Sequence, residues 1–306
     1  MASTNLGHNP EESGARLLRF VKKEIANPPS PAVFENAKVG HFEADHVAIF
    51  IHGFTANSAY LGTMMQEFVD NGIVALAFNY PSYDGIDRAA AELADALEAL
   101  DKMAGGSISK TRKVVLVCHS MGGLVARAFV SFNGGNRFVR KVVTLGTPHD
   151  ATLTNSQLVR CFVTWGEYYT GLNNGGYSSS CRSALQLTMQ DGANPFLQQL
   201  LQAKPVAPDV QFLSMSGGKN MLKFGENFIR NKLINAFLQW KLGPGANDGL
   251  VSESSSDFSN PKFRSCSPTC LPHFGAEKYV RYAETNHSFL ISTQRLTLEA
   301  ISFAKV

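Results

Sequence analysis

The chain has 306 residues, of which 44% are hydrophobic and 17% are charged, and its formal net charge is +3. This composition is ordinary for a globular protein with a substantial core, and it permits one large domain with insertions or two domains. Because the charge is mild and no basic run occurs, we set nucleic acid aside as a partner.

Targeting signals are not evident in the sequence. The first thirty residues hold no apolar segment behind a basic N-terminus, so we expect no secretory signal. The longest apolar runs, such as 47–51, are far too short to cross a bilayer, which predicts no transmembrane segment. The expected location is therefore the cytoplasm, with secretion of a trimmed form as the alternative.

The five cysteines are an odd number and form no CxxC pair, so a zinc site is not expected. In an oxidising compartment Cys161 can pair with Cys181, and Cys266 with Cys270, which leaves Cys118 as a free thiol. Reduced and unpaired thiols are equally compatible with the sequence.

From residue 46 onward, apolar β-branched runs alternate with helical patterns, whereas residues 1–45 are expected to form an N-terminal helix and loop region. A helix is predicted over 86–103, where Ala, Leu and Glu dominate before a Gly-Gly stop. This order of strand, helix and strand predicts an α/β fold with a mainly parallel sheet and helices on both faces. The predicted buried strands are 46–54, 72–81, 113–120, 140–149 and 209–217.

Two stretches interrupt the alternation. Residues 151–186 are aromatic and rich in Gly, Ser and Asn, which predicts a cap or lid insertion above the sheet edge. A second helical insertion is predicted over about 218–243, where apolar residues recur at helical spacing between Lys and Arg. This helix either packs on the protein's own core, which we favour, or makes transient contact with a lipid surface.

The segment 113–129, KVVLVCHSMGGLVARAF, joins a predicted strand to a predicted helix at Ser120. A sharp turn of this kind presents its apex residue above the sheet and needs small residues two positions before and after the apex. Gly122 meets this need, and Cys118 meets it approximately. The glycines are not followed by the Lys-Ser/Thr pair of a phosphate loop. Ser120 is therefore the predicted nucleophile, because the side chain of Cys118 belongs under the turn.

The segment HSMGGLVAR resembles the nucleophile elbow of lipases in the α/β-hydrolase superfamily. Other segments resemble bacterial true triacylglycerol lipases in the same chain order: an HG loop in IHGF, a GTPH strand end, an NDGLV acid loop and a late NH pair. Related GPI-inositol deacylase-like lipases share the HSMGG and GTPH elements. The match covers about 46–306, which we expect to be one α/β-hydrolase domain with the two insertions.

This resemblance implies a catalytic triad of Ser120, Asp248 and His287, in the order serine, acid and histidine that the fold uses. It also implies an oxyanion hole formed by the backbone N–H groups of Phe54 and Met121. A structural role is expected for His149 in GTPH, and Asp257 is kept as a reserve acid.

The implied activity is that of a serine hydrolase that cleaves acyl esters through an acyl-enzyme, as a triacylglycerol lipase or carboxylesterase. Phospholipid or thioester deacylation, and non-catalytic ligand binding on the same scaffold, are the alternatives. No cofactor is required. Many bacterial lipases hold calcium through an aspartate two residues after the catalytic histidine, but Phe289 stands there, so no metal is expected.

Five residues are candidates for substrate contact. Two of them are histidines that flank the HG loop and the nucleophile, and three are aromatic residues of the cap. The cap residues either line an acyl channel or seal the cap onto the core. These candidates are His52, His119, Trp165, Tyr168 and Tyr169.

Overall fold

The computed structural model describes residues 16–22, 32–150, 181–188, 194–202, 209–222, 228–242, 245–260, 263 and 277–306. Within these residues, one eight-stranded sheet has the order β2-β1-β4-β3-β5-β6-β7-β8. The strands are β1 (Arg16–Lys22), β2 (Val33–Asn36), β3 (Val47–Ile51), β4 (Val74–Asn79), β5 (Val114–His119), β6 (Val139–Leu145), β7 (Gln211–Gly217) and β8 (Glu277–Tyr282).

Six neighbouring strands run parallel to one another, as the sequence predicts: β4, β3, β5, β6, β7 and β8. Strands β3 and β5 are buried along their whole length, which explains why they read as continuous apolar runs without polar alternation. All five predicted strands are confirmed, with their ends shifted by a few residues.

The expected N-terminal helix and loop region is wrong where the structure describes it. Strand β1 pairs antiparallel with both β2 and β4, so this segment extends the sheet. Leu17 contributes to the core on one face and Phe20 to the core on the other, while Arg16, Arg19 and Lys22 interrupt the apolar residues of the strand. This mixed pattern lacks the apolar run that marks the central strands, and β8 at the opposite edge was missed for the same reason.

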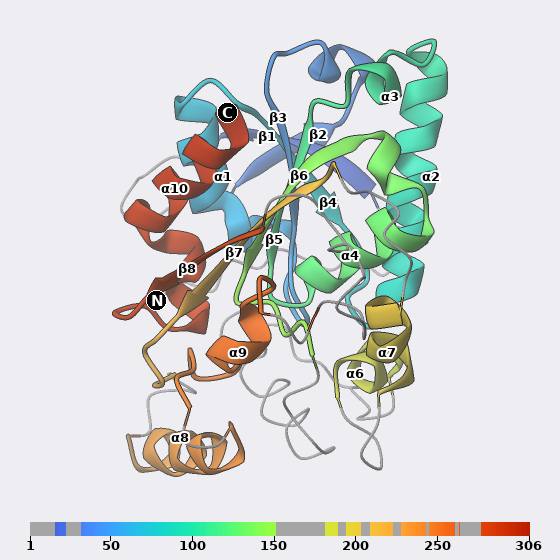
Figure 1. The fold of residues 1–306 in the computed structure, drawn as a ribbon. Coiled ribbons are helices and arrows are strands. Elements are labelled where there is room, and N and C mark those ends of the chain that lie inside the picture. Colours follow the sequence, from blue (N-terminus) through green and yellow to red (C-terminus); the bar gives the residue numbers. More distant parts are fainter. Residues whose placement is uncertain are drawn as a thin grey trace.

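Helices cover both faces of the sheet (Figure 1). On one face lie α2 (Ile86–Met103), which matches its predicted bounds, and α4 (Gly122–Phe132). On the other face lie α1 (Gly62–Asp70) and α10 (Gln294–Lys305). The remaining helices are α3 (Ser107–Thr111), α6 (Arg182–Leu187), α7 (Pro195–Gln202), α8 (Phe228–Leu242), α9 (Glu253–Ser256) and short 3-10 helices at Val39–Phe42, Ser58–Leu61, Gly135–Arg137 and His287–Ser292.

The predicted cap over 151–186 lies mostly outside the described residues. Its described end forms α6, which packs with α7 against the α2 and α4 face through Ala184, Leu197 and Leu200. Cys181, at the start of α6, carries a free thiol, as does Cys118, while the other cysteines lie outside the described residues.

Within the range of the predicted second helical insertion lies α8, which stands apart from the sheet at one end of the molecule (Figure 1). Leu238 is buried in a small separate cluster with Leu222, Leu250 and Val251. The favoured expectation that the apolar side of this helix packs on the core holds only in part: Ile234, Phe237 and Leu242 pack against this small cluster, whereas Phe228, Ile229, Leu233 and Trp240 are exposed. None of the described helices is both long and apolar enough to cross a membrane.

Candidate active site

Ser120 stands between the end of β5 and the start of α4 in a left-handed backbone conformation, with φ of 53°. Its N–H donates to the carbonyl oxygen of Leu145 at 2.8 Å, and its own carbonyl accepts a hydrogen bond from the Thr147 hydroxyl at 2.9 Å. A non-glycine residue in this region is strained and persists only where its surroundings hold it. The end of β6 therefore holds the predicted elbow in place.

The glycines of the elbow are required by close backbone packing. A Cβ on Gly122 would lie 2.8 Å from the carbonyl oxygen of His52 and closer still to that of Ile51, because α4 begins directly against the end of β3. A Cβ on Gly53 would lie 3.0 Å from the Cβ of Ser120. The HG loop and the predicted nucleophile are thus in direct contact.

Cys118 lies under the elbow as expected. It is fully buried in β5, where it is paired with Ile51 of β3 and Thr144 of β6. Burial raises the pKa of its thiol well above the usual range, which keeps the sulfur protonated. This position does not suit a nucleophile.

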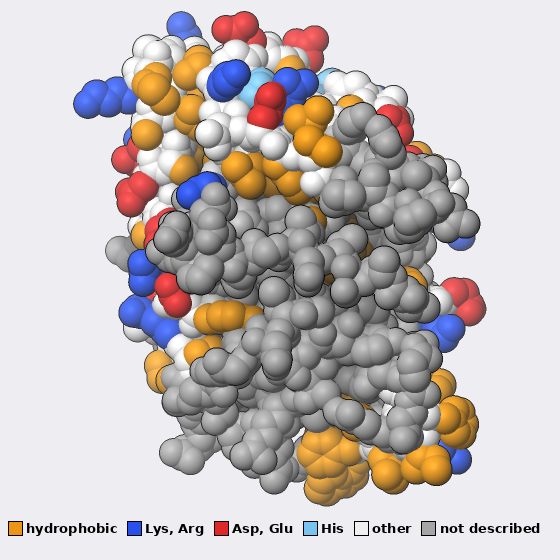
Figure 2. Space-filling view, turned by 180° about the vertical axis from the view of Figure 1, so that it is seen from behind, with side chains coloured by type: hydrophobic (Ala, Val, Ile, Leu, Met, Phe, Trp, Pro, Cys, Tyr) orange, Lys and Arg blue, Asp and Glu red, His pale blue; other side chains and the backbone are white. Residues whose placement is uncertain are grey.

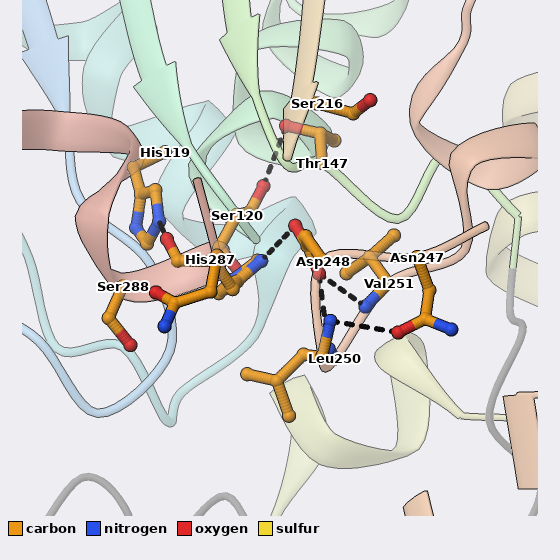
Figure 3. A network of polar contacts seen from close by, with 12 residues as sticks. His119, Ser120, Thr147, Ser216, Asn247, Asp248, Leu250, Val251, His287 and Ser288 are labelled. Carbon is orange, nitrogen blue, oxygen red and sulfur yellow. Dashed lines mark hydrogen bonds and ion pairs between the residues drawn. The ribbon is translucent and has the colours of Figure 1, made fainter. Parts of the chain in front are cut away.

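Asp248 and His287 form a buried pair, with 2.7 Å between the carboxylate Oδ2 and the ring Nδ1 (Figure 3). The other carboxylate oxygen, Oδ1, accepts hydrogen bonds from the N–H groups of Leu250 at 3.1 Å and Val251 at 2.8 Å. The backbone N–H of His287 also donates to the carbonyl of Asp248 at 2.9 Å. The structure therefore brings together two of the predicted residues that are 39 positions apart in sequence.

This arrangement selects one tautomer of His287. A carboxylate only accepts hydrogen bonds, so Nδ1 must carry the proton and Nε2 must hold the lone pair. In Figure 3, His287 lies with Ser120 on one side and Asp248 on the other. A base with its lone pair on Nε2 suits the removal of a hydroxyl proton.

Gly146, at the end of β6, is a site residue that sequence reasoning did not single out. Its φ is +58°, and a Cβ there would lie 2.8 Å from both Oδ2 of Asp248 and Nδ1 of His287. The signal that could have found it is the glycine of the GTPH segment, directly after a buried strand. Only glycine leaves room for the acid and base at this point.

The two predicted oxyanion donors, Phe54 and Met121, belong to segments that adjoin Ser120. Met121 follows it at the start of α4, where backbone N–H groups lack partners within the helix. Phe54 lies in the HG loop, which is held by a hydrogen bond from the Thr55 N–H to the Ser82 hydroxyl at 3.1 Å. Thr55 itself has a left-handed φ of 60°. The loop is therefore fixed beside the nucleophile.

His52 and His119 are both buried, which favours a supporting role over direct substrate contact. Nε2 of His52 accepts from the Tyr80 N–H at 3.3 Å, and the two rings stack at 4.2 Å. Nε2 of His119 lies 3.0 Å from the backbone carbonyl of His287. Burial, followed by the electrostatic interaction with His287, lowers the pKa of His119 to about 3, so the ring is neutral and donates to that carbonyl.

Other predicted residues are placed as follows. Trp165, Tyr168 and Tyr169 lie outside the described residues. His149 is buried, with its Nε2 at 3.3 Å from the Thr144 hydroxyl, in keeping with the expected structural role. Among the described residues, no group of three or more His, Cys, Asp or Glu side chains is placed to hold a metal ion.

A model of the alpha/beta hydrolase family matches residues 48–230, which is more than half of the chain. The chain therefore belongs to the alpha/beta hydrolase family. The match begins in β3 and includes the HG loop and the elbow. A search of curated proteins gave no match.

Several solved structures share the fold. The mature lipase BlEst2 of Bacillus licheniformis superposes with a TM-score of 0.58 at 20% identity, over 86% of this chain and 93% of that one. A gene product of Listeria innocua gives a TM-score of 0.51 at 16% identity, over 85% and 93%. An esterase of Exiguobacterium antarcticum gives 0.52 at 14% identity, over 86% and 93%. At these identities the likeness shows the fold.

Proposed function

We propose that this protein is a serine hydrolase that cleaves carboxylic esters of acyl chains, as a lipase or carboxylesterase. The observation that carries the proposal is the buried 2.7 Å pair of His287 and Asp248 beside a serine in a strained elbow. A serine hydroxyl becomes an effective nucleophile when a base held by an acid can take its proton. The names of two structural neighbours, a lipase and an esterase, add support for the ester class.

In the first half of the proposed reaction, Nε2 of His287 takes the proton of Ser120 Oγ as that oxygen attacks the ester carbonyl carbon. The ring becomes positively charged, and the carboxylate of Asp248 stabilises it through the Nδ1–H hydrogen bond. The carbonyl oxygen becomes an oxyanion and accepts hydrogen bonds from the N–H groups of Phe54 and Met121.

The tetrahedral intermediate then expels the alcohol oxygen, which receives the proton from Nε2 of His287. Ser120 is left as an acyl ester. In the second half, His287 takes a proton from water, the resulting hydroxyl attacks the acyl carbon, and Ser120 Oγ leaves with the proton. The products are a carboxylic acid and an alcohol, and the enzyme is restored.

Hydrolysis of p-nitrophenyl esters of increasing acyl length, below and above their solubility limits, tests this proposal. We expect release of p-nitrophenol by the wild type and none above background by Ser120→Ala. Ser131→Ala, in the last turn of the same helix α4, is the matched control and should keep full activity. Unaltered activity in Ser120→Ala would contradict the triad assignment.

The same assay separates the substrate classes within the proposal. A rise in rate above the solubility limit of long-chain esters indicates a lipase, whereas preference for short dissolved esters indicates a carboxylesterase. Parallel assays with acyl thioesters and phospholipids distinguish the two deacylase alternatives by their relative kcat/KM.

A further inference from the structure

Helix α8 presents an apolar stripe to solvent. Its residues Ile229, Leu233 and Trp240 are 69%, 67% and 71% exposed, and their spacing places them on one side of the helix with the exposed Ala236. Phe228, at the start of the helix, is 75% exposed. Figure 2 shows hydrophobic side chains gathered at the lower corner of the molecule, where α8 lies. A contiguous exposed apolar patch marks a surface for interaction.

The opposite side of α8 already has its partners. Asn235 is buried, and its amide exchanges hydrogen bonds with the backbone of Leu222, accepting from the N–H at 2.8 Å and donating to the carbonyl at 2.7 Å. Leu238 is fully buried in the small cluster with Leu222. The helix is thus oriented by its polar and buried side, and its apolar stripe faces outward in a fixed direction.

All the charged residues of α8 are basic. Its sequence contains Arg230, Lys232 and Lys241 and no acidic residue, and the exposed Lys219 lies in the segment that precedes it. In the described residues 218–222, 228–242 and 245–252, the one acidic side chain is Asp248, which is fully buried. A helix with exposed large apolar residues and a positive charge is typical of segments that lie in the interface of an anionic lipid layer.

Helix α8 and the segment before it are hydrogen-bonded to the neighbours of Asp248 and His287. Gln239 and Asn247 exchange side-chain hydrogen bonds at 3.1 Å, and Asn247 directly precedes Asp248. The Asn286 amide donates to the carbonyl of Met221 at 2.7 Å, and Asn286 directly precedes His287. Hydrogen bonds therefore tie α8 to the acid loop, and the segment before α8 to the base loop.

We propose that α8 docks this protein on an anionic lipid surface, with Ile229, Leu233 and Trp240 inserted among the lipid chains and the exposed Lys219 and Lys232 beside the headgroups. A second copy of the chain is a poorer occupant, because a symmetric contact would place the basic residues of the two helices against each other. The inference rests on the proposed function for its purpose, since docking would bring water-insoluble esters to the site.

Co-sedimentation with lipid vesicles tests this inference, using the Ser120→Ala protein so that binding is measured without hydrolysis. The probes are vesicles of phosphatidylcholine alone and of equal parts phosphatidylcholine and phosphatidylglycerol. We expect binding to the mixed vesicles, weaker binding to phosphatidylcholine, and loss of the difference at high salt.

Variants of α8 then locate the contact. Leu233→Ser with Trp240→Ser should weaken binding by about tenfold or more, since the lost apolar contacts are those buried on docking. Lys232→Glu should weaken binding to the mixed vesicles alone. Met103→Ser with Leu298→Ser is the matched control, because these residues are exposed and apolar on α2 and α10. All substituted side chains are exposed, so circular dichroism should show unaltered folding.

Absence of vesicle binding, or equal loss in the α8 and control variants, would overturn the inference. So would a dimer in light scattering that Leu233→Ser separates, since the stripe would then be covered by a second copy. These outcomes are distinct from failure of the proposed function: activity on dissolved esters without vesicle binding removes only the docking, and vesicle binding by a wild type without esterase activity removes only the hydrolysis.

Discussion

The serine half and the acid–base half of the candidate site are held by different physical means. Residues 118–123 lie where β3, β5 and α4 meet, and backbone contacts there leave no room for a Cβ at Gly122. Residues 247–251 and 285–287 lie outside the strands, and hydrogen bonds to named atoms hold them. Substitutions that add side-chain volume should therefore disrupt the serine half. Substitutions that remove one particular polar atom should disrupt the acid–base half.

The largest effect is expected from Asp248→Asn, which changes one polar atom in the acid–base half. The amide oxygen should keep the hydrogen bonds from the Leu250 and Val251 N–H groups, so the amide NH2 faces Nδ1 of His287. That nitrogen must then accept, which moves the ring proton to Nε2 and removes the base. We expect kcat for p-nitrophenyl esters to fall by about 10⁴-fold with little change in stability.

Asp257→Asn is the matched control for this prediction. Asp257 accepts hydrogen bonds from Ser259 in a neighbouring loop, and its substitution should leave kcat close to that of the wild type. A greater loss of kcat in Asp257→Asn than in Asp248→Asn would show that the acid has been assigned to the wrong residue.

Cys118→Leu tests the serine half by enlarging a buried side chain without adding a polar group. Because Cys118 is fully buried between β3 and β6, the added carbons must displace the strand end that carries Ser120. We expect a loss of about 1–3 kcal/mol in the free energy of unfolding and at least about 10²-fold in kcat. Cys118→Gly should stay active, because a small residue meets the demand of the turn. A fully active Leu variant would contradict the tight-turn argument.

Gly146→Ala tests the point where the halves meet. The added methyl group would press on both Asp248 and His287, and a displacement of about 1 Å in a catalytic pair costs about 10²-fold in rate. Gly72→Ala has a comparable positive φ but no atom near its Cβ, so it reports backbone strain without the contact. We expect Gly72→Ala to lower the free energy of unfolding and to leave kcat unchanged. An equal loss of kcat in Gly72→Ala and Gly146→Ala would refute the steric explanation.

The smallest effect concerns His119, because burial of its ring lowers its pKa from the usual 6.5 to about 3. The unfolded chain binds a proton below pH 6.5 while the folded ring does not, so this residue lowers stability as pH falls from 6.5 toward 3. We expect the stability of the wild type relative to His119→Asn to decline by about 1 kcal/mol per pH unit in this window. Urea unfolding at several pH values measures it, and a pH-independent difference would contradict the buried neutral ring.

The central strands and α2 could be predicted from sequence because their apolar patterns are long and uninterrupted. Strands β1, β2 and β8, at or next to the edges of the sheet, could not, because charged or polar residues interrupt their apolar residues and make them resemble loops. The exposure of α8 was also missed, since an apolar helix side has the same pattern whether it meets the core or solvent.

The serine half of the site could be predicted from its local sequence, whereas the acid–base half could be predicted only from the family resemblance. Ser120 and Gly122 follow from one local segment, because the sterics of the turn act over a few residues. The pairing of Asp248 with His287 spans 39 positions and was available through family resemblance, which supplies the spatial arrangement that spacing cannot. Gly146, Asn247 and Asn286 went unnoticed because their contacts exist only once the strands are assembled.

Labelling of the folded protein with a fluorophosphonate tests most directly whether the buried pair of His287 and Asp248 activates Ser120. Peptide mass spectrometry should find one adduct, on Ser120, which should not form in protein denatured before labelling and should fall sharply in Asp248→Asn. A folded protein that takes up no label, or takes it up on another residue, would contradict the account.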